Sequence, residues 1–437
     1  MREMKDSGVE WIDKIPSSWS IVPLKTMVSF GKGLPITKEN LIEKGVAVVS
    51  YGQIHSQINV GSHLNKELVR YVSDEYLQSN RNCLAKKGDI LIADTSEDYE
   101  GIGNSVLNDW DENLFAGYHT VIIRPSDRTY SKYLAYLFMT DSWRSQLRSR
   151  ASGIKVFSVT RSLLKKTAII IPRENSVQKI TDYLDAKCSK INEIIEKQQA
   201  IVEKLKEYKL SVIIETVTKG LNPNVEMKDS GVEWIGQMPT SWDCTTVGMI
   251  ATVVRGASPR PAGDPLYFNG TDVPWITVAE VTKGDGKYID GTETFLTFEG
   301  AKQSRIVEEG TLLLSNSGAT LGVPKITRIR GCINDGSVAF YNLSINQEFL
   351  LYLFKGRTFE LRKQMQGYGQ PNLNTTIVKG IEVPLPTELE QKAIVEFLDQ
   401  KCTAIEKTIE DREKAIDKLQ EYKKSLIYEV VTGKKEV

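Results

Sequence analysis

The sequence predicts a mixed α/β protein with two tandem globular domains, separated by two long helices that form an antiparallel coiled coil. Three observations lead to this fold class. The peptide MKDSGVEWI occurs at residues 4–12 and again at 227–235. Two stretches without Gly or Pro, residues 174–218 and 388–432, correspond position by position without a gap. Strand-like runs precede each stretch, so the chain is an internal duplication with an expected pseudo-two-fold arrangement.

Each stretch without Gly or Pro has the pattern of a helix that packs against a partner helix. Apolar residues return at alternating steps of four and three, which places them on one narrow stripe. At ~1.5 Å per residue each helix would be roughly 65 Å long, which is wider than a small domain. The first stripe contains Leu184, Cys188, Ile191, Ile195, Val202, Leu205 and Val212, and the second contains Leu398, Cys402, Ile405, Ile409, Ile416, Leu419 and Leu426.

One position interrupts both stripes. Gln198 and its counterpart Arg412 stand where an apolar residue is expected, near the middle of each helix. In an antiparallel pair these two side chains would meet. We therefore expect a buried polar layer that fixes the register of the two helices.

The two globular regions are strand-rich with short helices. In the first half the apolar patterns predict strands at residues 46–50, 89–93 and 120–124 and a helix at 132–147. In the second half they predict strands at residues 273–278, 311–315 and 337–341 and a helix at 347–366. Residues 221–225, which include Asn-Pro-Asn, break the first long helix and serve as the linker.

Composition and charge are those of an ordinary globular protein. The 437 residues are 41% apolar and 26% charged, which excludes global disorder, and 56 basic residues balance 56 acidic ones. No apolar run approaches a membrane span, and the N-terminus lacks the apolar segment of a signal peptide. The five cysteines are scattered and odd in number, so we interpret them as small buried residues in a reducing cytoplasm.

Signatures of enzymes and metal sites are missing from the sequence. It contains neither GxxxxGK[ST] nor a GxGxxG that follows a strand and opens a helix. The histidines all lie in the first half and lack the spacing of a metal pair, so we interpret them as satisfied or surface side chains. They are His55, His63 and His119. Asp89 and Asp94 could suggest metal ligands, but Asp89 becomes Thr311 in the second half, which favours turn capping.

Basic residues gather at matching places in the two halves. Residues 142–172 carry seven basic side chains and no acidic one, and residues 355–370 carry four against the single Glu360. Basic side chains neutralise phosphates, and Arg, Gln and Asn can make bidentate contacts to base edges. A solvated surface is the simpler interpretation of any one residue. The repetition of the patch favours nucleic acid.

The duplication also predicts the form of a DNA target. Two related domains at opposite ends of an antiparallel helix pair share an approximate two-fold axis, as does duplex DNA, whose half-sites commonly lie ~34 Å apart. Because the two domains differ in sequence, their half-sites should differ too. We expect a split, asymmetric target with an unread spacer.

These features resemble the specificity (S) subunit of type I restriction-modification systems. The resemblance covers essentially the whole chain, and residues 153–158 (GIKVFS) make the first half the more divergent copy. It is carried by the repeated MKDSGVEWI…P-x-S-W segment, the strands opened by Gly88 and Gly310, residues 367–374 (GYGQPNLN), residues 383–386 (VPLP) and Glu390-Gln391.

The resemblance implies a division of labour along the chain. Residues 1–173 and 221–387 would be target-recognition domains for double-stranded DNA, and residues 174–220 and 388–437 would be spacer helices. Two methyltransferase (M) subunits would dock on the helices and supply S-adenosylmethionine, and restriction (R) subunits would join them. The chain itself would be catalytically silent, with no cofactor or metal of its own.

The resemblance and the charge pattern together give candidate DNA-binding residues. The first group consists of Arg144, Arg148, Lys155, Arg362, Gln366, Tyr368 and Gln370. The second group follows the matched strands, where hydroxyl and amide groups can bond phosphates or bases. It consists of Thr95, Ser96, Ser315, Asn316 and Ser317, which are also ordinary turn residues.

Two other functions stay open from the residues alone. A coiled-coil adaptor whose domains bind proteins would fit the neutral charge and the long helices, and it predicts no retention of DNA. A fused methyltransferase or nuclease would need a motif such as Asn-Pro-Pro-aromatic. The nearby Asn222-Pro223-Asn224 does not match that motif.

Overall fold

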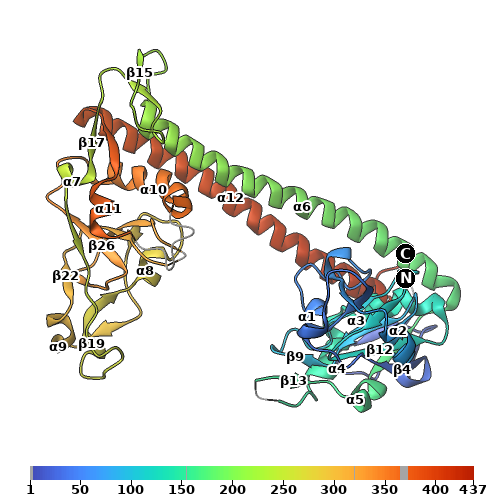
Figure 1. Cartoon of the computed structure of the whole chain (residues 1–437). Helices are drawn as coiled ribbons and strands as arrows, with labels where there is room; N and C mark the ends of the chain where they lie inside the picture. The colour runs from blue at the N-terminus through green and yellow to red at the C-terminus, as the bar shows by residue number, and fades with distance from the viewer. Residues whose placement is uncertain (1–2, 154, 319, 365–372) are drawn as a thin grey trace. The chain divides into compact units, whose positions relative to one another are not determined.

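The computed structural model describes residues 3–153, 155–318, 320–364 and 373–437. It divides into two compact units. Unit 1 contains Met1–Gln198 and Lys414–Val437, and unit 2 contains Gln199–Glu413. Each unit holds one globular domain and one part of each long helix (Figure 1).

The two long helices confirm the expectation from the sequence. They are α6 (Glu174–Lys219) and α12 (Glu388–Val431). Thr387 and Glu390 open α12 with a reciprocal cap, in which the amide of Thr387 donates to Glu390 Oε2 at 2.9 Å and the amide of Glu390 donates to Thr387 Oγ1 at 3.4 Å. Gly220 and Gly433 follow the helix ends with positive φ angles of 76° and 71°, the usual glycine conformation at a helix C-terminus.

The helices run antiparallel in each unit. In unit 2, Lys209 of α6 forms an ion pair of 2.7 Å with Glu406 of α12. In unit 1, Lys423 of α12 donates to Asn192 Oδ1 of α6 at 2.8 Å. In the alignment of the two repeated stretches, Lys423 is the counterpart of Lys209, and Glu406 is the counterpart of Asn192. Equivalent positions therefore pair with the same register in both units.

The predicted stripe is the buried face of the helices over most of its length. Its buried members are Leu184, Cys188, Ile191, Val202, Leu398, Cys402, Ile405, Ile416 and Leu426, and its half-buried members are Ile195, Leu205, Ile409 and Leu419. Towards the end of α6, however, Ile213 and Val217 are buried and Val212 is only half-buried. Ile213 and Val217 belong to the domain core of unit 2, so packing against that domain decides which side of the helix is buried here.

Gln198 and Arg412 lie where the two units adjoin in the sequence. Gln198 is half-buried and Arg412 is exposed. Their meeting as a polar layer stays a prediction, which the thermal stability of the double Leu variant would test.

Two four-stranded sheets form the globular part of unit 1. The first is antiparallel, with the order β10 (Ser105–Leu107), β8 (Ile90–Ala93), β12 (Thr120–Pro125) and β4 (Val28–Lys32). The second includes one parallel pair, β5 with β11, and has the order β6 (Arg70–Val72), β5 (Val46–Val49), β11 (Leu114–Ala116) and β7 (Leu84–Ala85). The strands VAVV and ILIA are buried along their whole length, which explains their continuous apolar sequence.

Unit 2 repeats this plan. Its larger sheet has the order β18 (Thr252–Arg255), β26 (Ser337–Tyr341), β23 (Leu312–Ser315), β24 (Pro324–Thr327) and β20 (Tyr288–Ile289). Its smaller sheet has the order β21 (Phe295–Leu296), β19 (Phe268–Ile276), β25 (Gly331–Ile333) and β22 (Arg305–Val307). All six strands expected from the sequence are present, with ends that differ by a few residues.

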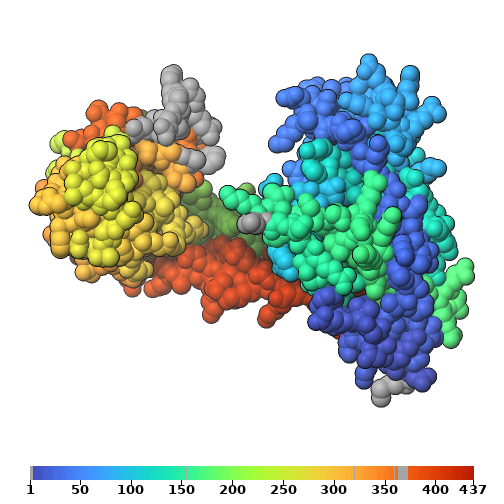
Figure 2. Space-filling view, turned by 90° about the horizontal axis from the view of Figure 1, so that it is seen from below, coloured from blue at the N-terminus to red at the C-terminus, as the bar shows by residue number. Residues whose placement is uncertain are grey.

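Short two-stranded pairs complete each domain. In unit 1 they are β1 (Met4–Asp6) with β2 (Lys14–Pro16), β3 (Ser20–Pro23) with β14 (Ala168–Ile171), and β9 (Thr95–Ser96) with β13 (Phe157–Ser158). In unit 2 they are β15 (Met227–Asp229) with β16 (Gln237–Pro239), and β17 (Asp243–Thr246) with β27 (Glu382–Leu385). The pairs β3 with β14 and β17 with β27 join strands near the start and the end of their domain. Figure 2 shows the green residues before α6 on the surface of unit 1, beside its blue N-terminal segment.

The helix expected at residues 132–147 is wrong as a single element. The structure has α3 (Ser131–Phe138) and α4 (Asp141–Arg148), with Thr140 between them in an extended conformation. Thr140 Oγ1 accepts a hydrogen bond from the amide of Trp143 at 3.4 Å, so this residue caps a new helix. In unit 2 the corresponding α10 (Gln347–Gln364) is continuous, and the expected residues 365–366 lie outside the described residues.

The remaining α-helices in the described parts of the chain are short. They are α1 (Tyr51–Ile54), α2 (Tyr76–Ser79), α5 (Arg161–Lys166), α7 (Val247–Ile250), α8 (Val278–Thr282), α9 (Phe298–Lys302) and α11 (Thr375–Lys379). Among the described residues, no helix is both long and apolar enough to cross a membrane.

Each globular core is completed by a helix end that comes from the other repeat. In unit 1, Leu426 and Val430 of α12 join the domain core, and Tyr133 donates its hydroxyl proton to the carbonyl of Val431 at 2.9 Å. In unit 2, Ile213 and Val217 of α6 join the core in the same way. The domains are thus tied to both helices by apolar burial.

The repeated P-x-S-W segment packs against these helix ends. A Cβ added to Gly433 would stand 2.5 Å from Pro16 and 3.1 Å from Trp19, and one added to Gly220 would stand 3.1 Å from Trp242. Trp19 and Trp242 are both buried. The segment is therefore repeated because it covers the end of a helix in each unit.

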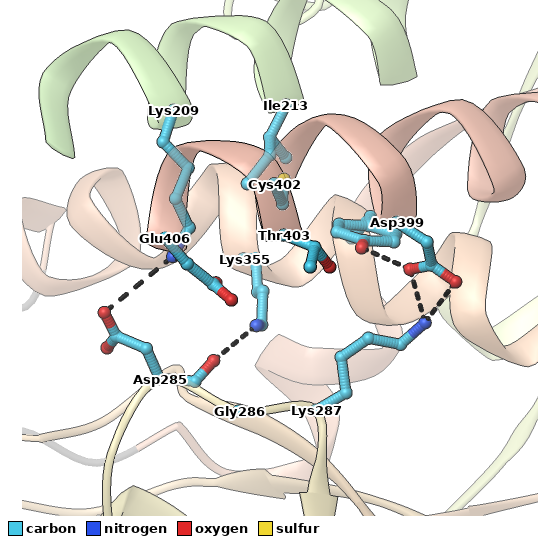
Figure 3. Close-up of a pocket in the computed structure, with 11 residues that line it drawn as sticks. Lys209, Ile213, Asp285, Gly286, Lys287, Lys355, Asp399, Cys402, Thr403 and Glu406 are labelled. Carbon is cyan, nitrogen blue, oxygen red and sulfur yellow. Dashed lines mark hydrogen bonds and ion pairs between the residues drawn. The ribbon is translucent and has the colours of Figure 1, made fainter. Parts of the chain in front are cut away.

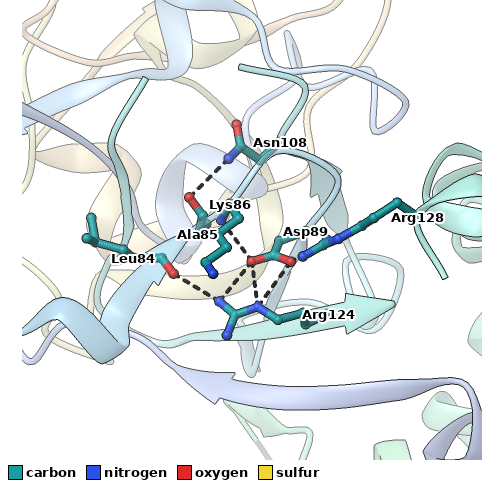
Figure 4. A network of polar contacts seen from close by, with 7 residues as sticks. All are labelled: Leu84, Ala85, Lys86, Asp89, Asn108, Arg124 and Arg128. Carbon is teal, nitrogen blue, oxygen red and sulfur yellow. Dashed lines mark hydrogen bonds and ion pairs between the residues drawn. The ribbon is translucent and has the colours of Figure 1, made fainter. Parts of the chain in front are cut away.

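Asp89 is buried at the start of β8 and holds three parts of unit 1 together (Figure 4). Its Oδ2 accepts from the amide of Lys86 at 2.8 Å, which confirms the turn-capping role. Arg124 Nη2 lies 2.9 Å from Oδ2 and Arg128 Nη1 lies 2.6 Å from Oδ1. The two guanidinium groups compensate a carboxylate that has no access to water.

We expect Asp89→Ala to destabilise unit 1 by about 3 kcal/mol, because it leaves Arg124 without its buried partner. Thermal and denaturant unfolding would measure the loss. Asp111→Ala is the matched control, since Asp111 forms an exposed ion pair with Lys87 and should leave the unfolding midpoint unchanged. Equal effects of the two substitutions would contradict this account.

Candidate nucleic-acid interface

The ends of the central strands occupy equivalent places in the two domains. The amide of Asp94, after β8, donates to the carbonyl of His119 at 3.1 Å. The amide of Asn316, after β23, donates to the carbonyl of Gly336 at 2.9 Å. Asp94 therefore corresponds to Asn316, and His119 to Gly336. The two repeats keep the backbone here and change the side chains.

A surface hollow of about 410 Å³ lies at this edge in unit 1. It is lined by side chains from β4, β9, the turn before β12 and the start of α5, among them Lys32, Asp94, Thr95, Tyr118, His119 and Arg161. One lysine, one arginine, one imidazole and one exposed phenol thus surround the same space. Such a set can bond phosphates and base edges.

Thr95 and Ser96 have different roles in this region. Thr95 Oγ1 lies 2.9 Å from Asp94 Oδ1 and 3.0 Å from His119 Nδ1, so it belongs to the polar group of the hollow. Ser96 is buried and donates to the carbonyl of Asp98 at 2.7 Å. The structure therefore places Thr95 at the candidate site and gives Ser96 a turn-stabilising contact.

Arg144 and Arg148 are occupied by contacts within unit 1. Arg144 Nε donates to the carbonyl of Phe138 at 2.9 Å, and burial, followed by the nearby charge of Arg148, lowers the pKa of Arg144 to about 10. Arg148 is only 9% exposed and pairs with Asp141 at 2.9 Å and Glu100 at 3.2 Å. These contacts within the domain are enough to account for the placement of both arginines. Lys155, in contrast, is exposed.

In unit 2 the three serine and asparagine candidates also separate. Ser315 is buried, accepts from the amide of Val323 at 2.9 Å and donates to the carbonyl of Thr320 at 2.7 Å. Asn316 is fully buried, and neither end of its side-chain amide has a hydrogen-bond partner among the described residues. Ser317 is half-buried beside it.

Of the candidates in the second basic patch, the structure describes Arg362. Its Nε donates to the carbonyl of Leu321 at 3.0 Å, and the residue is half-buried. Gln366, Tyr368 and Gln370 lie outside the described residues.

The sequence interpretation missed His119 because it considered histidines as metal ligands. Among the described residues no group of three or more His, Cys, Asp or Glu side chains could hold a metal. His55 is indeed satisfied, with Nε2 2.8 Å from the carbonyl of Thr95 and Nδ1 3.1 Å from Asn104 Nδ2. His119 instead lies at the surface hollow, and its position directly before a buried strand was the available signal.

A second, smaller hollow of about 60 Å³ lies within unit 2 where the domain meets the helices (Figure 3). Lys287 forms ion pairs with Asp399 at 2.6 Å and Glu348 at 2.9 Å. Lys355 donates to the carbonyl of Asp285 at 2.7 Å. Both lysines form ion pairs or hydrogen bonds with groups of the chain itself, so this hollow is a structural junction between the domain and the helices.

Unit 1 has a related junction, in which a lysine of the domain helix stands where unit 2 has a glutamate. Tyr136 donates to Asp185 at 2.7 Å, and Lys132 of the same helix forms the ion pair with Asp185. In unit 2 a glutamate, Glu348, stands at the equivalent helix position, and Lys287 from a loop supplies the positive charge. Both domains are thus fixed to the long helices by an aspartate of the helix.

A family model described as the type I restriction modification DNA specificity domain matches residues 16–204 and 239–413, which is most of the chain. The chain belongs to this family. Both matched stretches combine a recognition domain with part of a long helix.

Individual S subunits are similar over different lengths. The MjaIX specificity subunit of Methanocaldococcus jannaschii is 31% identical over 172 residues, and the chain spans only 38% of that protein. The MjaVIII specificity subunit of the same organism is 24% identical over 393 residues, which are 83% of this chain and 85% of that protein.

A solved chain from a study of complex assembly and conformational transition of the type I R-M system has the same fold. It aligns with a TM-score of 0.72 at 18% identity, over 95% of this chain and 98% of that chain. The fold class predicted from the sequence and the suspected S-subunit family are both confirmed.

The pKa of Lys355 predicts a pH effect on the stability of unit 2. Burial, followed by repulsion from Lys209, lowers this pKa from 10.5 to about 8. Between these values the unfolded chain holds a proton that the folded protein has released, so folding becomes more favourable as pH rises. We expect the stability of the natural protein, relative to Lys355→Met, to rise by about 2 kcal/mol from pH 7 to pH 10.

Denaturant unfolding of both proteins at several pH values would measure this change. The lost hydrogen bond to Asp285 is a constant offset, because a backbone carbonyl does not titrate. A relative stability that does not change with pH would reject the assigned pKa.

Arg362→Ala tests the second basic patch. If Arg362 contacts a phosphate, the substitution should weaken DNA binding by the assembled complex and reduce the slope of log K against log salt by about 1. Arg330→Ala is the matched control, because Arg330 is an exposed arginine of the same domain that pairs with Glu308 at 3.0 Å. An unchanged salt slope would exclude a phosphate contact for Arg362.

Proposed function

We propose that this S subunit recognises a split, asymmetric DNA target, with residues 1–173 reading one half-site and residues 221–387 reading the other. The observation that carries the proposal is the matched pair of sheet edges: the backbone contacts are the same, but Asp94 and His119 stand in one domain where Asn316 and Gly336 stand in the other. Because different side chains prefer different base edges, the half-sites differ.

In this proposal the chain has no catalytic activity and carries no cofactor. Two M subunits bring S-adenosylmethionine and methylate adenine, and R subunits join them for cleavage, in the cytoplasm. The helices at residues 174–220 and 388–437 are the docking region. Tyr208 and Tyr422, which hold equivalent positions in the two helices, are 49% and 52% exposed, and such a repeated exposed aromatic residue supports two equivalent contacts.

Single-molecule sequencing of adenine methylation, with and without this gene, tests the proposal. We expect one split, asymmetric methylated motif to disappear when the gene is deleted and the M subunit is kept. Exchange of residues 5–171 with those of another S subunit should then change only one half of the motif. If no motif depends on the gene although the M subunit is expressed, the recognition function is wrong and an adaptor function takes its place.

A further inference from the structure

We propose that His119, held by Asp94 and Thr95, reads a base in the half-site of the first domain, and that Lys32 and Arg161 contact the neighbouring phosphates. This inference rests on the proposed function and adds the residues that set the specificity of one half-site. It concerns the hollow at the end of β8 and the start of β12 in unit 1.

The backbone of His119 is in an unusual conformation. Its φ angle is +52°, in the left-handed region that residues other than glycine adopt only in a few per cent of cases. In unit 2 the equivalent residue, Gly336, does not have a positive φ angle, so the left-handed conformation belongs to the first domain alone of the two. A residue other than glycine held in this region costs conformational energy, and such residues cluster at functional sites.

The hydrogen bonds of His119 fix which ring nitrogen faces outward. Nδ1 lies 2.8 Å from Asp94 Oδ1, and a carboxylate only accepts, so Nδ1 carries the proton. Nε2 forms no hydrogen bond with any described part of the chain, and the side chain is 37% exposed. Nε2 is therefore available to a base edge: it accepts from an amino group when neutral and donates to guanine O6 or N7 when protonated.

The groups behind His119 hold it in place. Thr95 Oγ1 donates to Asp94 Oδ1 at 2.9 Å, and the carbonyl of Thr95 accepts from His55 Nε2 at 2.8 Å. The ring of Tyr51 meets the ring of His119 edge to face, with centroids 5.6 Å apart. A base-reading side chain needs such support, because discrimination depends on its position within a few tenths of an ångström.

The surroundings of His119 match a nucleic-acid strand. Tyr118 is 45% exposed, and the centroid of its ring lies 4.0 Å from that of the imidazole, so it offers an aromatic surface for a base or a thymine methyl group. Lys32 and Arg161 line the same hollow and supply positive charge at its rim. One imidazole flanked by two cations and an aromatic ring contacts both the bases and the backbone of a duplex.

The equivalent edge in unit 2 has different chemistry for the same task. Gly336 has no side chain, and the buried Asn316 has an unpartnered side-chain amide among the described residues. Arg255 replaces Lys32, since the two residues hold the same place opposite Val338 and Val121. The cation is thus kept in both domains, whereas the candidate base-reading group is not.

The test uses His119→Gly in the intact chain, expressed with its M subunit. Glycine adopts the positive φ angle of His119 without steric cost, so the fold should be kept. We expect methylation to lose base discrimination by about tenfold or more at one position of one half-site, with the other half-site unchanged. His63→Ala is the control, because His63 is exposed in the same domain and does not line the hollow.

The outcomes are distinct. A motif that is unchanged in both halves overturns the inference, as does a change confined to the half-site assigned to the second domain by domain exchange. If His119→Gly abolishes methylation, binding of the assembled complex to duplexes altered at each position decides. Selective tolerance at one position supports base reading, and an equal loss for every duplex overturns it. Failure of the proposed function shows differently, since the natural protein would then direct no motif.

Discussion

The structure depends on the burial of each helix end against the domain of the other repeat. Trp19 and Trp242 cover the glycines that end α12 and α6, and the last turns of these helices belong to the two domain cores. A single long helix with one apolar stripe is unstable in water, and a domain without its last apolar layer is incomplete. Each helix end therefore requires the domain that covers it, and each domain requires that helix end to complete its core. The two repeats are thus expected to fold together.

This constraint also fixes how the domains are attached to the helices. The aspartates Asp185 and Asp399 of the helices receive a tyrosine hydroxyl and a lysine from each domain, although the lysine comes from different elements in the two units. The ion pair is thus preserved while its source changes. What has to be kept is a neutralised carboxylate at the half-buried junction, because an unpaired charge there would be costly.

The fold could be predicted from the sequence because its determinants are local and repeated. The stripe of the helices, the buried strands and the repeated Trp segment are each visible in short stretches. The break at Thr140 was not foreseen, because apolar periodicity continues across it and only a side-chain cap interrupts the helix. The exact course of the stripe near Val212 also depended on packing against a domain core.

The candidate site was harder to predict because charge alone does not reveal whether a residue is free. Arg148 lies in a stretch without acids, yet the fold brings Glu100 to it from a distant segment. His119 looked unremarkable because its importance comes from a positive φ angle and from a hydrogen bond to Asp94, neither of which has a sequence signature. Thr95 was found because it follows a matched strand, which is a topological clue.

These observations explain why specificity can change without loss of the fold. The buried strands β8 and β23 end at the same backbone hydrogen bond, so the main chain beyond them starts from the same place in both domains. The side chain of His119 is 37% exposed, so its replacement need not disturb the buried strands behind it. Selection can therefore alter the residues at this edge independently in each domain, while burial at the helix ends keeps the rest of the structure constant.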